Sequence, residues 1–372
     1  MTLRILTAGE SHGPALTGIM EGMPAGLPLS EADIDHDLRR RQQGYGRSGR
    51  QVIEKDHAQI LGGVTGGRTT GGPIALQIEN RDWPNWRDKP RPVMTIPRPG
   101  HADLAAAQKY RYADLRLGLE RASARETATR VGLGAIARAL LAHAGIVVAS
   151  QVVAIGPVQA TPVDLADPNT RRRVDQSPVR TGDEAGQQAM IAAIDDARRA
   201  RDTVGGVIRV EALGVPAGLG SHVHWDRKLD GRLAGAMMSI QAIKGVEIGA
   251  GFAGAATPGS RLHDPIMPGD GGTRRPSNNA GGLEGGITNG QPVVVTVAMK
   301  PISTLLKGME SVDIATGEPT RATYERSDIC AVPAAGVVAE AMMCLVLADA
   351  LLEKFGGDSV EELDEHMARA ES

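Results

Sequence analysis

Apolar residues recur along the chain with two different periods, and each period predicts one kind of element. Alternating apolar residues or short apolar runs predict strands over residues 16–20, 52–61, 73–78, 146–155, 206–213, 246–252 and 292–299. Apolar residues at helical spacing predict helices over residues 123–143, 184–199, 229–240 and 334–355, followed by a polar, acidic C-terminal helix. Strand clusters and isolated strand–helix pairs are mixed irregularly, which indicates an α+β fold.

Two stretches lack any period. Residues 80–100 and 258–290 are crowded with glycine, proline and polar residues, which predicts long loops, and long loops inside compact domains often carry function. No repeat of fixed length occurs, and no proline- or serine-rich linker clearly divides the chain. We therefore expect one large domain over residues 1–372.

Composition and charge exclude several classes of protein. The net charge of −3 over 372 residues argues against a general nucleic-acid binder. The chain begins without the basic region and apolar core of a signal peptide, and we find no run of about 18 uncharged apolar residues to predict a membrane span. Cys330 and Cys344, the only cysteines, lie in apolar surroundings, as in a reduced protein without disulfides. These features predict a cytoplasmic protein.

Two histidines stand in short runs that contain glycine. His12 lies in residues 9–13 (Gly-Glu-Ser-His-Gly), and His101 lies in residues 98–103 (Arg-Pro-Gly-His-Ala-Asp). Glycine lets the backbone approach a ligand closely, and histidine exchanges a proton near neutral pH. We interpret the two runs as parts of an enzyme site that moves protons beside an anionic substrate.

Arginine is unusually dense near these runs. Residues 39–50 hold five arginines, among them Arg40, Arg41, Arg47 and Arg50, together with glycines that break any helix. Planar guanidinium groups bind phosphate and carboxylate bidentately, so we favour a site for a small anion. A solvated surface turn and an RNA-binding segment are the open alternatives.

A second basic cluster lies at the start of the predicted helix at residue 123. Ser123 and Glu126 fit the capping-box pattern. Arg121 and Arg125, however, place two cations at the positive end of the helix dipole. A bound anion between these arginines would resolve the conflict, since helix N-termini are ready phosphate sites.

Two further motifs have structural interpretations. Gly132-x-Gly134 resembles a dinucleotide fingerprint but lies inside a predicted helix, so close helix packing explains it better. His222 and His224 would share one face of a strand but have no further ligand at metal spacing, so we expect no metal site.

The C-terminal part holds two more candidate sites. Residues 300–304 (Lys-Pro-Ile-Ser-Thr) follow an apolar strand and offer a cation and two hydroxyls to a phosphate. Asp328 lies two residues after Arg326, an arrangement that fits either a surface ion pair or a functional carboxylate.

Together these segments resemble the chorismate synthase family. The similarity spans nearly the whole chain, because several separate motifs occur in the right order. The shared segments are residues 9–13, 40–47, 54–56, 98–103, 121–127, 278–282 and 326–340. Gln42-Gln43 stands where many members carry Pro-Gly, and Ser327 where many carry His. We expect no added flavin-reductase domain.

The resemblance implies a reaction and a fold. Members convert 5-enolpyruvylshikimate 3-phosphate to chorismate by an anti 1,4-elimination of phosphate, which requires reduced FMN although the reaction has no net redox change. The two carboxylates and the phosphate of this substrate would account for the arginines. The implied fold is a β-α-β sandwich with helices between two antiparallel sheets, assembled as a homotetramer.

The same resemblance implies roles for individual residues. His12 would protonate the departing phosphate, and His101 would protonate or stabilise the reduced flavin near N1. Ser11 and Ser123 would relay protons. Asp328 would lie near flavin N5 and help to remove the C6 proton of the substrate.

Ligand contacts also follow from the resemblance. The implied FMN contacts are Arg121, Ala122, Ser123, Gln241, Ala242, Gly286, Lys300, Pro301, Ile302, Ser303, Thr304 and Arg326. Arg41 and Arg47 match positions associated with NADPH, a candidate reductant of the flavin, although they could equally hold substrate. The implied substrate contacts are Arg40, Arg47, Arg50 and Arg125. Because aromatic residues make up only 2% of the chain, we expect aliphatic, glycine and arginine contacts to hold the flavin ring.

Two other classes of function are the competing hypotheses. A phosphate-ester hydrolase or phosphotransferase would use His12 as a nucleophile and would need no flavin. A non-catalytic anion- or RNA-binding module would be built on residues 39–50, and its binding of oligonucleotides would depend steeply on salt.

Overall fold

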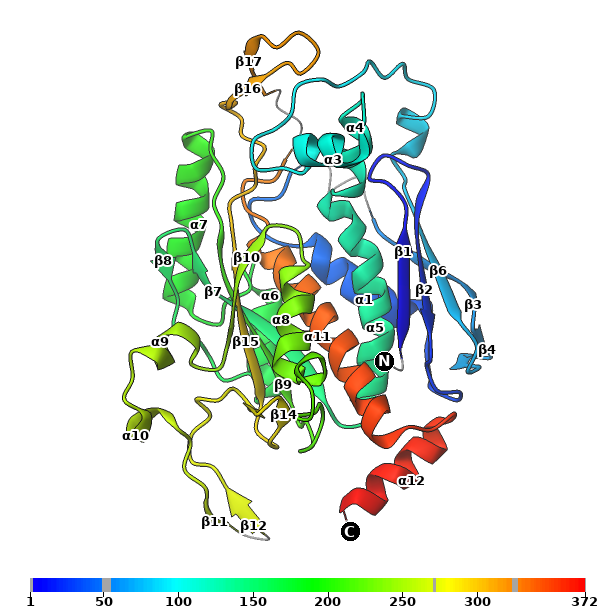
Figure 1. Ribbon diagram of the computed structural model, residues 1–372, viewed down its shortest axis with the longest axis vertical. Coiled ribbons are helices and arrows are strands. Elements are labelled where there is room, and N and C mark those ends of the chain that lie inside the picture. The colour runs from blue at the N-terminus through cyan, green and yellow to red at the C-terminus, as the bar shows by residue number, and fades with distance from the viewer. Residues whose placement is uncertain (1–2, 49–54, 270–271, 323–326, 372) are drawn as a thin grey trace.

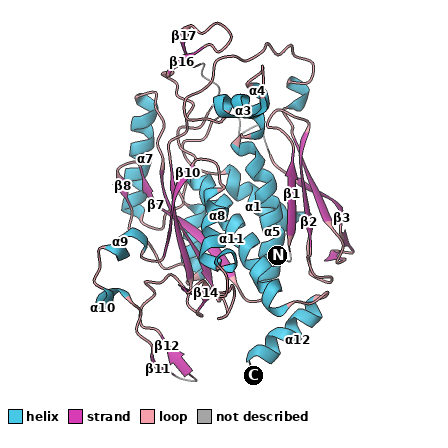
Figure 2. Ribbon diagram, viewed as in Figure 1, coloured by secondary structure: helices cyan, strands magenta, loops and turns pink. Residues whose placement is uncertain are grey.

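Two antiparallel sheets lie on either side of a layer of helices (Figures 1 and 2). The computed structural model describes residues 3–48, 55–269, 272–322 and 327–371. The first sheet consists, in spatial order, of β1 (Arg4–Ala8), β2 (Ala15–Glu21), β6 (Ile74–Glu79) and β3 (Ala58–Gly62). The second consists of β10 (Ile243–Ile248), β15 (Val293–Met299), β9 (Gly206–Leu213), β7 (Val147–Ile155) and β8 (Val158–Gln159). The α+β sandwich that the resemblance implied is confirmed.

Four helices fill the space between the sheets. They are α1 (Glu31–Gln42), α5 (Thr127–His143), α8 (Leu229–Met238) and α11 (Val332–Phe355). A single cluster of buried apolar side chains crosses all three layers, from Leu76 on β6 through Leu133 on α5 and Val337 on α11 to Val210 on β9. The two sheets therefore share one core, and burial of this apolar surface is the main force that holds the layers together.

Glycines let the central helix α5 approach its neighbours on both sides. A Cβ atom at Gly134 would lie 2.4 Å from the Cβ atom of Ala341 on α11, and one at Gly132 would lie 3.3 Å from a methyl group of Leu76 on β6. This geometry confirms close packing, rather than dinucleotide binding, as the explanation of the Gly132-x-Gly134 motif.

Helix α11 is apolar on nearly all sides. By length and composition alone it could cross a membrane, but 89% of its apolar window is buried within the protein. It packs against α1, α5 and α8 and against strands β7 and β9. A helix enclosed on all sides needs no polar face, so its composition reflects its place in the core.

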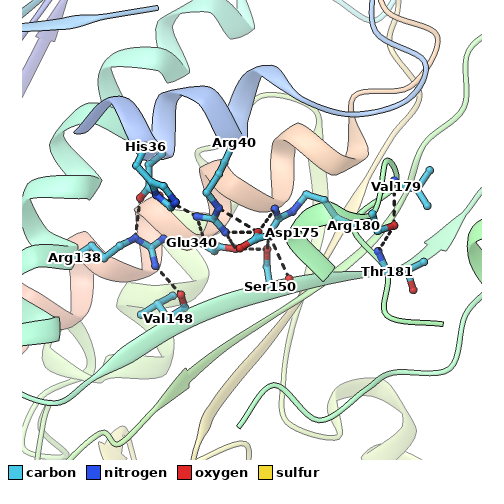
Figure 3. Close-up of polar contacts among 12 residues, drawn as sticks. His36, Arg40, Arg138, Val148, Ser150, Asp175, Val179, Arg180, Thr181 and Glu340 are labelled. Carbon is cyan, nitrogen blue, oxygen red and sulfur yellow. Dashed lines mark hydrogen bonds and ion pairs between the residues drawn. The ribbon is translucent and has the colours of Figure 1, made fainter. Parts of the chain in front are cut away.

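A buried ion cluster ties the helical layer to the second sheet (Figure 3). Glu340 on α11 accepts hydrogen bonds from Arg40 on α1 at 2.8 and 3.0 Å and from Arg138 on α5 at 2.7 Å. Arg180 and the hydroxyl of Ser150 on β7 donate to the same carboxylate at 2.9 and 2.6 Å. Burial raises the pKa of Glu340, but the three arginines outweigh this effect and hold the pKa at about 2.

Smaller elements surround this frame. Helices α3 (Asp103–Tyr110) and α4 (Arg116–Arg121) lie at one end, whereas α6 (Pro168–Gln176) and α7 (Glu184–Arg199) flank the second sheet (Figure 1). Helix α12 (Val360–Glu371) follows α11. The remaining short elements are β4 (Val64–Thr65), β5 (Arg68–Thr69), η1 (Trp83–Asn85), η2 (Ala124–Glu126), η3 (Trp225–Arg227), α9 (Gly251–Ala255), α10 (Gly259–Leu262), β11 (Met267–Gly269), β12 (Gly272–Arg274), β13 (Leu283–Glu284), β14 (Ile287–Thr288), β16 (Glu310–Val312) and β17 (Pro319–Arg321).

Most predicted elements are present, but several differ in their bounds. The strand predicted over 52–61 is β3, which begins at Ala58, and residues 52–54 lie outside the described part of the chain. Helix α7 and strand β9 agree with the prediction at both ends. The strand predicted over 246–252 is displaced, because Gly249 and Gly251 have φ values of +57° and +48° and turn the chain into α9. The helix predicted from residue 123 begins with the 3-10 turn η2 before α5.

The pattern did not predict α1, and this changes the interpretation of residues 39–50. Its buried apolar side chains are only Ile34 and Leu38, and its other buried residues are Asp37 and Arg41. Such a helix has too narrow an apolar stripe to be recognised by its period. The first three arginines of the basic run therefore belong to the last turn of a helix, not to a glycine-rich turn.

Candidate active site

A cavity of about 600 Å³ collects residues from most of the predicted motifs, a volume in the range of small-molecule sites. The predicted residues that line it are Ser11, His12, Arg41, Arg47, His101, Ala122, Ser123, Arg125, Gln241, Ala242, Lys300, Ile302, Ser303, Thr304 and Asp328. Predicted residues Arg50 and Arg326 lie outside the described part of the chain. Both histidine runs thus face one cavity, although they lie on different parts of the fold.

His12 lies in the turn between β1 and β2. Its Nδ1 is 2.9 Å from the hydroxyl of Ser11 and 3.8 Å from Oε1 of Glu120. The Trp86 ring and the imidazole pack in a T-shaped arrangement, with 4.7 Å between the ring centroids. A hydroxyl and a carboxylate beside one ring nitrogen, with an aromatic wall beside the ring, suit an imidazole that holds a proton.

His101 is anchored by a buried carboxylate. Its Nδ1 lies 2.5 Å from Oδ1 of Asp103, and Arg98 donates to the same carboxylate at 2.9 and 3.2 Å. Arg98 also donates to the hydroxyl of Thr304 at 3.1 Å, which links this motif to the segment 300–304. Burial raises the pKa of Asp103, but the hydrogen bonds from His101 and Arg98 outweigh burial and hold it well below its usual range. An ionised Asp103 accepts a hydrogen bond from Nδ1–H of His101 and leaves Nε2 as the nitrogen that faces a reaction partner.

An internal carboxylate explains the arginine cluster at the start of α5. Arg125 donates to Oδ1 of Asp56 at 2.6 Å, and Arg41 donates to Oδ2 at 3.3 Å. Asp56 is buried. The sequence predicted a bound anion between Arg121 and Arg125. For Arg125 the protein itself supplies this anion, the carboxylate of Asp56. Both Arg41 and Arg125 also line the cavity.

Asp328 forms a partly buried ion pair rather than a surface pair. Its Oδ2 lies 3.1 Å from Nη1 of Arg47, and the two side chains are only 13% and 10% exposed. The backbone N–H of Ser48 donates to Oδ1 at 2.7 Å. These contacts join the segment after α1 to the segment before α11 and hold a carboxylate at the cavity wall.

Two lysines add positive charge to the same wall. Nζ of Lys300 donates to the carbonyl oxygen of Gly100 at 2.9 Å, next to His101. Burial lowers the pKa of Lys300, and the charge of Lys244, which also lines the cavity, lowers it further. Two cations held this close favour an anionic ligand between them.

Gln241 and Ala242 carry two signs of a built site. The Oε1 atom of Gln241 is buried and accepts no hydrogen bond from any residue that the structure describes, while its Nε2 donates to Glu126 at 3.1 Å. Ala242 has a φ of +67°, a left-handed conformation that costs energy for a residue other than glycine and is concentrated at ligand sites. A buried acceptor in the wall of a cavity suits an N–H group of a ligand.

Arg40, expected to bind substrate, does not line this cavity. Its guanidinium group belongs to the ion cluster around Glu340, where it also donates hydrogen bonds to Asp37 at 3.0 Å and to Asp175 at 2.9 Å. Desolvation opposes its charge, but these carboxylates outweigh it and raise the pKa of Arg40 well above its usual value. The structure therefore gives Arg40 a structural place and corrects the expectation of a substrate contact in this cavity.

Three expected FMN contacts also lie outside the cavity lining. Arg121 is exposed and donates to the carbonyl oxygen of Thr7 at 3.0 Å. Gly286 lies against Lys228, because a Cβ atom added to this glycine would be only 2.7 Å from the Cβ atom of Lys228. Pro301 is exposed. Within one chain these three residues are not brought to the cavity.

Sequence reasoning missed several residues of the site. Arg98 and Asp103 flank His101 within one motif, so their spacing was a usable signal. Asp56 stands in a shared segment to which no role was given. Glu120 and Lys244 showed no signal at all, because only folding places them beside the cavity.

For metals, the described residues contain no group of three or more His, Cys, Asp or Glu side chains that could hold an ion. Nδ1 of His224 lies 2.6 Å from the exposed carboxylate of Asp226, an ordinary surface pair.

Comparisons with known proteins show the family to which the chain belongs. The sequence profile of the family described as chorismate synthase matches residues 3–352. The chorismate synthase of Moorella thermoacetica is 57% identical over 375 residues, which cover 98% of this chain and 97% of that protein. That of Acidothermus cellulolyticus is 54% identical over 376 residues, covering 97% and 96%. The chain belongs to the chorismate synthase family.

A crystal structure of a chorismate synthase has the same fold. It matches with a TM-score of 0.82 and 47% sequence identity, covering 100% of this chain and 97% of that one. Chorismate synthases are lyases of the shikimate pathway, so this chain is an enzyme of the lyase class.

Proposed function

We propose that the protein converts 5-enolpyruvylshikimate 3-phosphate to chorismate and phosphate by an anti 1,4-elimination that requires reduced FMN. The observation that carries this proposal is the single cavity in which His12 and His101 meet among arginines and lysines. A substrate with two carboxylates and a phosphate needs such a cationic surface, and its leaving group needs a proton donor.

The chemistry of the cavity wall suits FMN as well as substrate. Side chains of the wall that carry positive charge and could hold phosphate or carboxylate are Arg41, Arg47, Arg98, Arg125, Lys244 and Lys300. Apolar side chains that could pack on a flavin ring are Leu119, Ile240, Ala334, Ala335 and Val338. No Trp, Tyr or Phe occurs among the described residues of this wall, in line with the aliphatic contacts expected from the sequence. The buried Oε1 of Gln241 would accept a hydrogen bond from the flavin.

The proposed roles of the chain concern protons. His12 gives a proton to the departing phosphate, whose second pKa of about 6 lies close to that of an imidazole. Ser11, 2.9 Å from Nδ1 of His12, and Ser123 relay protons. Asp328 helps to remove the C6 proton as the bond to the 3-phosphate breaks. His101, fixed through Nδ1 by Asp103, protonates or stabilises the reduced flavin. Reduced FMN, when bound, supplies transient electron donation that assists the loss of phosphate.

We further propose that the chain acts as one domain in a cytoplasmic homotetramer. Gly286 does not line the cavity of its own chain, so a second copy is the source that would bring this residue to a bound flavin. The mass of the particle in solution tests the assembly, and a monomer with full activity would contradict it.

Anaerobic turnover of 5-enolpyruvylshikimate 3-phosphate tests the proposed reaction. We expect chorismate to form with reduced FMN and none to form without flavin, together with a transient flavin absorbance signal. A parallel arm with oxidised FMN and NADPH shows whether the protein reduces its own flavin. Equal phosphate release without flavin would support a hydrolase or phosphotransferase instead, and salt-sensitive oligonucleotide binding without turnover would support a binding module.

A further inference from the structure

A buried carboxylate lies directly behind His12. Glu120, near the end of α4, has a side chain that is 9% exposed, and its Oε1 is 3.8 Å from Nδ1 of His12. The carbonyl oxygen of Glu120 also accepts a hydrogen bond from the backbone N–H of Ser11 at 3.2 Å. Helix α4 is therefore joined to the histidine turn by its backbone as well as by this side chain.

The long loop over residues 80–100 holds the carboxylate and the turn together. Arg91 donates through Nη1 to Oε1 of Glu120 at 3.1 Å and through Nη2 to the carbonyl oxygen of His12 at 3.2 Å. Its guanidinium lies 5.7 Å from the ring centroid of Trp86 and 6.0 Å from that of Trp83. One stacked arginine thus fixes the position of Glu120 relative to His12.

Building on the proposed function, we propose that Glu120 is a positioning residue that keeps a proton on His12 until the phosphate leaves. A carboxylate about 4 Å from an imidazole favours its protonated form. The pair is shielded from water on the Trp86 side, which strengthens the interaction relative to an exposed pair.

Other charges around Glu120 determine the pH below which its carboxylate becomes protonated and stops stabilising the imidazolium of His12. Burial raises the pKa of Glu120, the charges of Arg91 and Arg116 lower it, and those of Glu10 and Asp114 raise it again. Below its raised pKa the carboxyl group is neutral and no longer supports the imidazolium. Glu120 should therefore affect the alkaline limb of the pH–rate profile, the pH range in which His12 loses its proton.

The variant Glu120→Gln tests this role, with Glu120→Asp as the conservative rescue. We expect Glu120→Gln to move the alkaline limb of the pH–rate profile down by about one pH unit, so that turnover above the limb falls about 10-fold. Turnover should converge with that of the unchanged protein at lower pH, which a merely structural defect would not produce. Glu120→Asp should restore most of the shift. Glu211→Gln is the matched control, because Glu211 is 10% exposed and paired with Arg209, away from the cavity.

A measurement without substrate or flavin separates this inference from the proposed reaction. The imidazole resonance of His12, assigned by its loss in His12→Gln, should titrate with a lower pH midpoint in Glu120→Gln than in the unchanged protein. If the unchanged protein is inactive with substrate and reduced FMN, the proposed function fails, whereas the titration still reports on Glu120. An unmoved midpoint and an unmoved alkaline limb in an active protein would overturn the role of Glu120.

Discussion

Replacing His12 with alanine is expected to lower turnover by roughly 10- to 1000-fold, and His101→Ala should have an effect of similar size. His12 lies beside a hydroxyl and a carboxylate, and His101 is fixed by Asp103 at 2.5 Å. Both side chains line one cavity, and each is assigned the transfer of a different proton. Steady-state turnover with reduced FMN measures the loss, and circular dichroism shows that the fold is kept.

The two variants should differ in their response to flavin. His101→Ala is expected to weaken binding of reduced FMN, whereas His12→Ala should bind it like the unchanged protein, because His12 is assigned to the leaving phosphate. His224→Ala is the control, since that side chain is 59% exposed and its ion pair is with the exposed Asp226. A rate near that of the unchanged protein in either variant would remove the role given to that histidine.

Replacing Glu340 with glutamine is expected to lower the free energy of unfolding by about 3–5 kcal/mol. The carboxylate is fully buried, and Arg40, Arg138 and Arg180 all donate to it. Removing its charge leaves these guanidinium groups without their shared anion in a low-dielectric interior. Urea unfolding at neutral pH and fixed protein concentration measures the loss.

At low pH the difference in unfolding free energy between Glu340→Gln and the unchanged protein should disappear. The folded-state pKa of Glu340 is about 2, below the ordinary value of 4.5, so its contribution is complete above 4.5 and is lost as pH falls through about 2. The gap between Glu340→Gln and the unchanged protein should therefore narrow across that range. Glu353→Gln on the same helix is the control, because its side chain is 30% exposed and its loss should cost less than about 1 kcal/mol. Equal effects of the two substitutions would refute the special place of Glu340.

Periodicity identified the elements whose burial follows a regular rule. Strand β9 buries the apolar side chains of Ile208, Val210 and Ala212 at alternate positions. Helix α7 buries one face, and both elements were predicted at their observed bounds. Helix α1 buries Asp37 and Arg41 through contacts with distant residues. Edge strand β1 exposes Leu6 to 70%. Neither element has the pattern that burial of one apolar face would produce.

The residues of the site also fall into two groups, those that a local motif predicted and those that only tertiary contacts define. His12 and His101 were recognised because glycine and a titratable ring stand together within a few residues. Glu120 was not, since its neighbours in sequence show no relation to His12 and the contact depends on how α4 packs beside the turn after β1. Arg40 is the opposite case. It lies in a local motif that predicted a substrate contact, but its guanidinium group pairs with the carboxylate of Glu340, 300 residues away.

By itself the sequence determined the local chemistry and the fold class, because repeated apolar spacing and short motifs act over a few residues. Tertiary structure alone decided which charges meet. Ion pairs such as Arg40 with Glu340 and Arg125 with Asp56 join residues that lie 300 and 69 positions apart in the sequence. Their electrostatic energy depends on distance and burial in three dimensions. Which arginines can bind a ligand and which hold the fold together is therefore settled only when the sheets close on the helices.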